Sequence, residues 1–279
     1  MINSIGKWKV IPLETGDFRL DGGAMMGSVP KTLWEKTNTP DELNRIDLAM
    51  RCILLDDDNN RVLIESGMGD KLETSFIERF HVQQPNHPLM KRLNEAGYKM
   101  EDITHVILTH LHFDHSGGAT TFDEYDNLVP TFPNAMYYIS ESNWVAGLNP
   151  SPRDTASYLD INYAPLKNRG NLELVKENAI IMDGISTISV NGHTNGQQLI
   201  KIESEGDVLI FCSDLIPLKS HLQLPWIMGY DLNAALTLAE KKAFLEKASS
   251  KNWLLFLYHD PNVIAVTIKK GDKYYEVLD

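Results

Sequence analysis

The stretch His110-Leu111-His112-Phe113-Asp114-His115, which continues as Ser116-Gly117-Gly118, places three histidines and an aspartate close together. Imidazole and carboxylate groups are ligands well suited to zinc and the neighbouring first-row metals. The alternative is a polar, solvated loop in which these side chains bind nothing. If the four side chains are buried, a metal is needed, because burying them without one would carry a large desolvation cost. The stretch therefore predicts a metal site, and its four ligands are enough to be divided between two ions.

Three later residues extend this set. His193, Asp214 and His259 each follow an apolar run that predicts a β-strand. A single histidine or aspartate after a strand is usually structural. Together with the first stretch, however, these residues form a set of ligands at strand ends, where loops on a rigid scaffold usually carry function.

The first half of the chain reads as β-rich. Residues 8–17 and 49–55 predict strands, and the second of these pairs with 61–65 across the polar turn 56–60. Residues 88–96 predict a helix that Gly97 ends. The apolar run 103–109 then predicts a buried strand, which would deliver His110 to a strand end.

The second half of the chain also combines predicted strands with a helix. Strands are predicted over 184–190, 197–202, 208–212, 253–257, 263–268 and 273–278. Asn233 is expected to cap a helix that runs to about Ala248. Strands in each half with helices between them predict an α/β (α+β) fold of two sheets packed face to face and covered by helices. Because no linker or internal repeat divides the chain, we expect one domain over residues 1–279.

Composition and charge limit the kinds of binding partner and the cellular location that we expect. The chain is 43% hydrophobic and 23% charged, with a formal charge of −12, which disfavours binding to nucleic acid or to anionic membranes. No apolar segment is long enough to span a bilayer, and Met1–Val10 lacks the apolar core of a secretory signal. Cys52 and Cys212 lie in strand-like runs and are expected to be buried, reduced thiols. These features favour a cytoplasmic protein.

With these residues the chain resembles the metallo-β-lactamase superfamily, whose pattern is His-x-His-x-Asp-His followed by a histidine, an aspartate and a final histidine. The resemblance covers nearly the whole chain and implies a four-layer αββα sandwich of two mixed sheets flanked by helices. It also implies two divalent metal ions, zinc first, with manganese, iron or cobalt as alternatives. The implied ligands are His110, His112 and His193 for one ion, Asp114, His115 and His259 for the other, and Asp214 as the bridge between them.

Two positions narrow the branch of the family, and a third departs from its pattern. The bridging residue is Asp214, whereas zinc β-lactamases of the commonest type use a cysteine ligand, so antibiotic hydrolysis is disfavoured. His112 stands where the diiron redox members carry a glutamate, so a redox role is disfavoured too. Glu65 replaces the more familiar aspartate. A glutamate there can still accept a hydrogen bond from a ligand histidine, although its longer stem changes the reach.

The segment from Asp21 to Trp34 resembles the loop of quorum-quenching N-acyl homoserine lactonases and is also similar to the methyl parathion hydrolase branch. The spacing of the later ligands fits the same lactonase group. A lactone or related ester is therefore the expected small-molecule substrate. An apolar channel for it is predicted from Met25, Met26, Trp34, Phe113, Trp226, Met228 and Tyr230. A protein core or a homodimer contact would explain the same residues equally well.

The resemblance also assigns catalytic roles. A bridging hydroxide would attack the lactone carbonyl, with Asp214 holding the two metals and Asp114 shuttling the proton. Some lactonases carry a tyrosine three residues after the bridging aspartate, but here that position is Pro217. His221 or Tyr230 is the expected substitute.

Other functions remain open at this point. A phosphotriesterase would use the same hydroxide on phosphorus, and a neutral triester is compatible with the acidic chain. A glyoxalase-II-like thioesterase would need a basic pocket, yet the C-terminal segment around Tyr258 to Pro261 has no Arg/Lys cluster. A non-catalytic metal-binding sensor domain is the alternative outside enzymes, and the complete ligand set argues against it.

Overall fold

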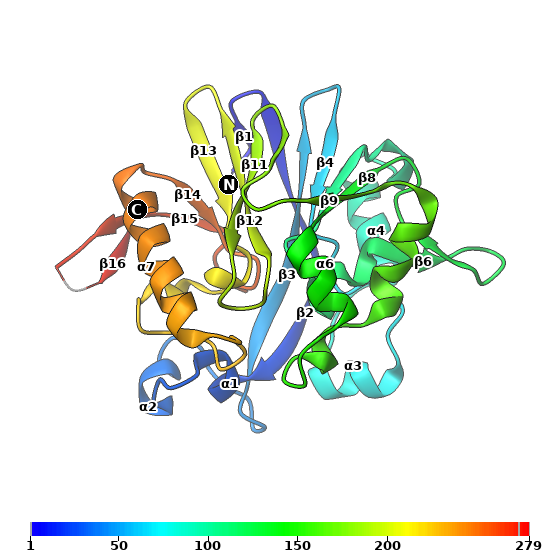
Figure 1. Cartoon of the computed structure of the whole chain (residues 1–279). Helices are drawn as coiled ribbons and strands as arrows, with labels where there is room; N and C mark the ends of the chain where they lie inside the picture. The colour runs from blue at the N-terminus through cyan, green and yellow to red at the C-terminus, as the bar shows by residue number, and fades with distance from the viewer. Residues whose placement is uncertain (1, 273, 279) are drawn as a thin grey trace.

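The computed structural model describes residues 2–272 and 274–278 of the chain, and the predicted four-layer sandwich is confirmed in it. Two seven-stranded sheets lie side by side in the centre, and helices cover their outer faces (Figure 1). Among the described residues, no helix is both long and apolar enough to cross a membrane.

The first sheet has the order β1-β2-β3-β4-β5-β8-β9. Its strands are β1 (Ser4–Ile5), β2 (Trp8–Asp21), β3 (Arg45–Asp56), β4 (Arg61–Ile64), β5 (His105–Ile107), β8 (Met136–Ser140) and β9 (Leu172–Val175). The strands from β1 to β4 pair antiparallel, whereas β4, β5, β8 and β9 run parallel. The carboxyl ends of these four strands therefore meet at one edge.

The second sheet follows chain order from β10 to β16. Its strands are β10 (Ile180–Met182), β11 (Ile185–Val190), β12 (Gln197–Ser204), β13 (Asp207–Phe211), β14 (Leu254–Phe256), β15 (Ala265–Lys270) and β16 (Tyr275–Leu278). Only β13 and β14 pair parallel, because the long helix α7 connects them. The loops after both strands consequently emerge on the same side.

Helices and short pieces complete the chain. The α-helices are α1 (Gly22–Met26), α2 (Lys31–Trp34), α3 (Thr74–Phe80), α4 (Pro88–Glu95), α5 (Phe113–Ser116), α6 (Glu141–Leu148) and α7 (Ala234–Ser250). The 3-10 turns are η1 (Met100–Asp102), η2 (Gly117–Ala119), η3 (Thr155–Ser157), η4 (Asp160–Asn162), η5 (Ala164–Arg169), η6 (Ser213–Leu215) and η7 (Lys219–Leu222). Strands β6 (Thr120–Phe122) and β7 (Leu128–Pro130) form a separate small hairpin.

Apolar side chains divide into three buried clusters that match the layers. One cluster lies between the sheets and includes Ile53 from β3 and Phe211 from β13. A second lies between the first sheet and the helices α4 and α6, and a third between the second sheet and α7. Each sheet is therefore covered on both faces, which explains why its central strands read as almost continuous apolar runs.

Most predicted elements are confirmed, with shifted ends. The β3–β4 hairpin and the helix α4 lie where expected. Asn233 caps α7 by accepting a hydrogen bond from the Leu236 amide. The strand predicted over 103–109 is only β5, because the chain leaves the sheet at Leu108 and the Thr109 amide donates to a side chain instead. Lys273, the predicted start of the last strand, lies outside the described residues. Both cysteines are free and buried, as predicted.

Candidate metal centre

The loop after β5 turns the first stretch of ligands inward. The Thr109 amide donates to Glu65 Oε1 at 2.8 Å, which ties this loop to the end of β4. His112 then begins the single turn of α5, and its carbonyl accepts a hydrogen bond from the His115 amide at 3.1 Å. This turn brings Asp114 and His115 to the same side as His110 and His112. All four side chains are buried.

The two glycines after this turn let the loop lie directly on its neighbour. A Cβ on Gly117 would lie 2.0 Å from the Met68 carbonyl oxygen, and one on Gly118 would lie 2.2 Å from the Ser66 carbonyl oxygen. No side chain fits at these distances, so glycine is required for close backbone approach. The close approach also holds Glu65 beside the ligand loop.

The predicted ligands come together as three overlapping groups, in each of which the candidate ligand atoms lie within 4.8 Å of one another. The groups are His110, His112 and His193; His110, His115 and Asp214; and Asp114, His115 and His259. Every member is buried. Residues from both sheets thus converge on one centre, although the sequence separates them widely.

Asp214 lies between the two sides of this centre. Its Oδ2 is 3.3 Å from His193 Nε2. Its Oδ1 is 3.3 Å from both His115 Nε2 and His259 Nε2. One carboxylate oxygen therefore faces each side, which is the geometry that a bridging ligand requires.

The residues fit a pair of divalent cations. The buried atoms His110 Nε2, His115 Nε2 and Asp214 Oδ1 have no hydrogen-bond partner among the described residues. Buried polar atoms without a partner are costly, and a metal ion would satisfy all three. Ligand atoms around a tetrahedral ion with bonds of about 2.0 to 2.1 Å lie about 3.3 Å apart, which matches the distances around Asp214.

The electrostatics favour the same interpretation. Burial lowers the pKa values of His110 and His112 far below the usual range, so both imidazoles are neutral and free to act as ligands. Burial also opposes a charge on His115, but Asp214, Asp114 and Glu65 outweigh it and raise the pKa of His115. The carboxylates therefore create a strongly negative centre that would attract cations.

Most of the ligand imidazoles use their other ring nitrogen to hold a second group. His193 Nδ1 lies 2.8 Å from Asp231 Oδ1, and His259 Nδ1 lies 2.9 Å from the Ala49 carbonyl oxygen. Glu65 Oε2 lies 3.4 Å from His115 Nδ1 as an ion pair, but no hydrogen bond joins these two atoms. Such partners orient a ligand and raise its basicity. Asp231 was missed in the sequence because it lies in an irregular turn with no pattern around it.

A cavity of about 420 Å³ opens onto this centre. That volume lies within the range of small-molecule sites. Its lining includes His112, Asp114, His193, Asp214 and His259. The remaining lining residues are Leu20, Met25, Leu48, Phe80, Phe113, Arg153, Asp154, Ala156, Ser157, Met228, Gly229 and Tyr230. Of the predicted channel residues, Met25, Phe113, Met228 and Tyr230 line this cavity.

Four predicted substrate contacts do not line this cavity. Met26, Trp34 and Trp226 are buried in the apolar cluster between the sheets and are not among the lining residues. His221 is 1% exposed, and its Nε2 donates to the Met25 carbonyl oxygen at 3.0 Å. Burial lowers the pKa of His221 to about 3, so it is a neutral packing residue.

The cavity also contains residues that the sequence did not suggest. Arg153, Asp154 and Ser157 come from an irregular segment between α6 and η4, and Leu48 and Phe80 come from β3 and α3. None of them belongs to a motif. Their only signal is tertiary, since many separate segments of the chain close around the same space.

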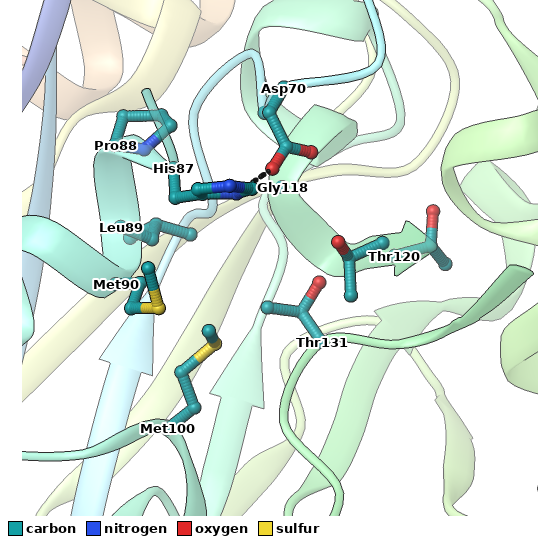
Figure 2. A pocket seen from close by; sticks show the side chains of 11 residues that line it. Asp70, His87, Pro88, Leu89, Met90, Met100, Gly118, Thr120 and Thr131 are labelled. Atoms are coloured by element: carbon teal, nitrogen blue, oxygen red, sulfur yellow. Dashed lines mark hydrogen bonds and ion pairs between the residues drawn. The ribbon is translucent and has the colours of Figure 1, made fainter. Parts of the chain in front are cut away.

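Another hollow lies beside the loop that follows the metal ligands (Figure 2). His87 and Asp70 pair across it, with Nδ1 and Oδ2 at 2.5 Å, while Leu89 and Met100 line it (Figure 2). Its volume of about 30 Å³ has room for a water molecule or two. His81 and His105 also lie apart from the centre, beside Gln83 and Tyr138 respectively. These three histidines contribute nothing to the metal site.

Comparison with known proteins agrees with this geometry. The structure of a probable metal-dependent hydrolase from Staphylococcus aureus is similar to this chain, with 28% identity, a TM-score of 0.90 and 99% of each chain covered. The structure of AidC, a dizinc quorum-quenching lactonase, has 22% identity and a TM-score of 0.80, covering 99% of this chain and 95% of that one. An N-acyl homoserine lactonase of a Bacillus species is 24% identical over 235 residues, which are 80% of this chain and 85% of that protein.

The family model of the metallo-beta-lactamase superfamily matches residues 51–259. That range holds all seven predicted ligands and most of both sheets. The chain belongs to the metallo-beta-lactamase superfamily.

Proposed function

We propose that this protein is a dinuclear metal-dependent hydrolase that opens lactones, with N-acyl homoserine lactones or related lactones as substrates. The observation that carries the proposal is the cavity, in which five of the candidate ligands face an apolar wall. Phe113 packs edge-on against Phe76 with ring centroids 5.0 Å apart, and Phe80 lies beside both. A wall of this kind suits an acyl chain.

The likeness to proteins named as N-acyl homoserine lactonases supports the same substrate class. Arg153 is the one cationic side chain, apart from histidines, among the described residues that line the cavity. A thioester of glutathione would need more positive charge, so the lactone is the better match. We also propose that the protein is cytoplasmic.

The chemistry needs an activated water and a polarised carbonyl. Two divalent ions, zinc first, would supply both at neutral pH. Asp114 lies 3.5 Å from His259, measured from its Oδ2 to His259 Nε2. Because Asp114 also lines the cavity, its carboxylate can accept a proton from the attacking water. As the bond between the carbonyl carbon and the ring oxygen breaks, Asp114 returns that proton to the leaving oxygen. The products are a carboxylic acid, which releases its proton to the solvent at neutral pH, and a hydroxyl group on the same molecule.

Tyr230 is the candidate donor to the carbonyl oxygen, in place of the tyrosine absent at Pro217. It lines the cavity, whereas His221 does not. Burial, with the charges of Asp21 and Asp114, raises the pKa of Tyr230 to about 12. The phenol therefore keeps its proton at neutral pH and can donate a hydrogen bond to developing negative charge.

The test is steady-state hydrolysis of a substrate panel by protein whose metal content has been measured. The panel contains a short-chain and a long-chain acyl homoserine lactone, paraoxon and S-lactoylglutathione. We expect the lactones to react far faster than the others, with about two metal ions bound per chain. Faster hydrolysis of paraoxon or of the thioester would refute the lactone assignment and leave the hydrolytic centre. Metal binding without any turnover would favour the sensor alternative.

A further inference from the structure

Helix α7 contains two adjacent residues that reach the loops around the metal centre without touching the cavity. Lys241 is buried, with an exposed fraction of 1%, and Glu240 is half-buried. Neither residue is among those that line the cavity. A lysine buried to this degree needs compensating partners, because an unpaired charge in the interior is costly.

The partners of Lys241 are backbone carbonyls of one loop. Its Nζ donates to the Gln223 carbonyl oxygen at 2.9 Å and to the Trp226 carbonyl oxygen at 2.5 Å. That loop continues to Asp231, whose carboxylate holds His193. Asp231 also acts on the ammonium group, since its charge opposes the effect of burial on the pKa of Lys241. The lysine is therefore linked to the ligand both through the chain and through charge.

Glu240 holds the loop on the other side of the same ligand. Its carboxylate accepts hydrogen bonds from the amides of Asn191 and Gly192, at 2.8 and 3.0 Å. These two residues lead directly into His193. The two loops also bind each other, because the Leu232 amide donates to the His193 carbonyl oxygen at 3.1 Å. One turn of α7 therefore fixes both the backbone of His193 and its carboxylate partner.

We propose that Glu240 and Lys241 are positioning residues of the metal centre, which fix the orientation of His193 through the 191–193 loop and through Asp231. Neither residue contacts the coordinating atoms of the candidate ligands or lines the substrate cavity. Their substitution should therefore change metal affinity first. The inference rests on the two-metal part of the proposed function and is independent of the lactone.

The experiment measures metal binding without any substrate. Lys241→Met keeps the length of the side chain and removes the donors, and Glu240→Ala removes the acceptors. The matched control is Lys242→Met, because Lys242 is the exposed neighbour on the same helix. Zinc affinity is measured by competition with a chelator. In addition, the absorption spectrum of the cobalt-substituted protein reports the geometry of the site.

Both test variants should bind one of the two ions about 10- to 100-fold more weakly, as expected when an outer partner of a ligand is lost. Their cobalt spectra should change, while the control should match the unaltered protein. The double variant Lys241→Met/Asp231→Asn should lose no more affinity than Asp231→Asn alone, since both residues act on His193.

Some outcomes would overturn the inference. One is retention of both ions with unaltered affinity in Lys241→Met and Glu240→Ala. Another is equal weakening of both ions, together with a matching fall in the melting temperature of the chelator-treated protein, because that pattern indicates general destabilisation. Additive losses in the double variant would show that Lys241 does not act through Asp231. Absence of lactonase activity would leave this inference intact, since no readout uses a lactone.

Discussion

The two sides of the metal centre are built in opposite ways. On the side of the first sheet, one short stretch carries His110, His112, Asp114 and His115, and two glycines press it against the loop of Glu65. On the side of the second sheet, His193, Asp214 and His259 come from three separate strand ends. The first side is specified locally. The second depends on how β11, β13, β14 and α7 pack, so it should be the more sensitive to distant substitutions.

The largest expected effect comes from Asp214, whose carboxylate lies between His193 and the pair His115 and His259. Asp214→Asn keeps the shape of the side chain but weakens the bridge between His193 and the pair His115 and His259. We expect hydrolysis to fall by at least about 10³-fold, with fewer than two metal ions retained. Elemental analysis and turnover of the best panel substrate check this. Two tightly bound ions and near-normal turnover in the variant would show that Asp214 is no bridge.

The next prediction compares one outer carboxylate from each side. Glu65→Gln should weaken the ion beside His115, and Asp231→Asn should weaken the ion beside His193, each by about 10- to 100-fold. Chelator competition on both variants gives the measurement. Because Glu65 also accepts from the Thr109 amide, its variant keeps part of that contact. Loss of the same ion in both variants would contradict the assignment of His115 and His193 to different ions.

A smaller effect is expected at the substrate end of the cavity. Tyr230→Phe removes the donor for the carbonyl oxygen and should lower kcat about tenfold with little change in KM, as for a hydrogen bond to developing charge. His221→Asn is the comparison, since His221 lies outside the cavity. The measurement is kcat and KM of both variants for one lactone. An unchanged kcat in Tyr230→Phe would exclude the tyrosine from the reaction.

The apolar wall should affect substrate binding only. Phe80→Ala on α3 is expected to raise KM for a long-chain lactone about fivefold, which corresponds to the loss of about 1 kcal/mol of apolar contact. The short-chain lactone should be less affected. Ile77→Ala is the matched control on the same helix, because Ile77 is 39% exposed and lies outside the cavity lining. Equal changes for both chain lengths would argue against an acyl site at this wall.

The last prediction compares the buried Lys241 with the half-buried Lys71, and it concerns the free energy of unfolding. Burial lowers the pKa of Lys241 to about 7 and that of Lys71, which donates to the carbonyls of Gly117 and Thr120, to about 8, from 10.5 for each. Between these values and 10.5 the unfolded chain binds more protons than the folded one. The free energy of unfolding should therefore rise with pH from about 7 to about 10.

Lys241→Met should flatten that rise more than Lys71→Met, because its pKa is the further displaced. Urea unfolding of the metal-free protein at several pH values gives the slopes, with Lys242→Met as control. Asp231 opposes the effect of burial on the pKa of Lys241, and the charge of Lys241 helps to lower the pKa of His221, so Asp231→Asn should change the slope as well. Identical slopes in all variants would contradict the assigned pKa values.

The residues themselves show where prediction from sequence succeeds. The apolar runs before His110, Asp214 and His259 predict strands, and each of these residues follows a strand in the structure, because alternation of apolar runs and polar loops is a local signal. Residues 119–183 contain β6 to β10 and α6, but the sequence patterns predict no element there, since its strands are short and its turns are irregular. Met26 and Trp34 do not line the cavity, and their sequence pattern cannot show this, because an apolar side chain suits a core and a ligand cavity equally well.

The sequence alone determined the ligand types, their order and the family resemblance, because imidazole and carboxylate side chains suited to divalent metals stand at fixed positions of the chain. It also determined the close contact of the Gly117-Gly118 loop, which only glycine permits. Tertiary structure decided the rest. Two sheets brought Asp214 between two groups of histidines, and α7 placed Lys241 and Glu240 behind His193. The cavity is likewise a product of packing, since many separate segments surround it and no local pattern encodes the space between them.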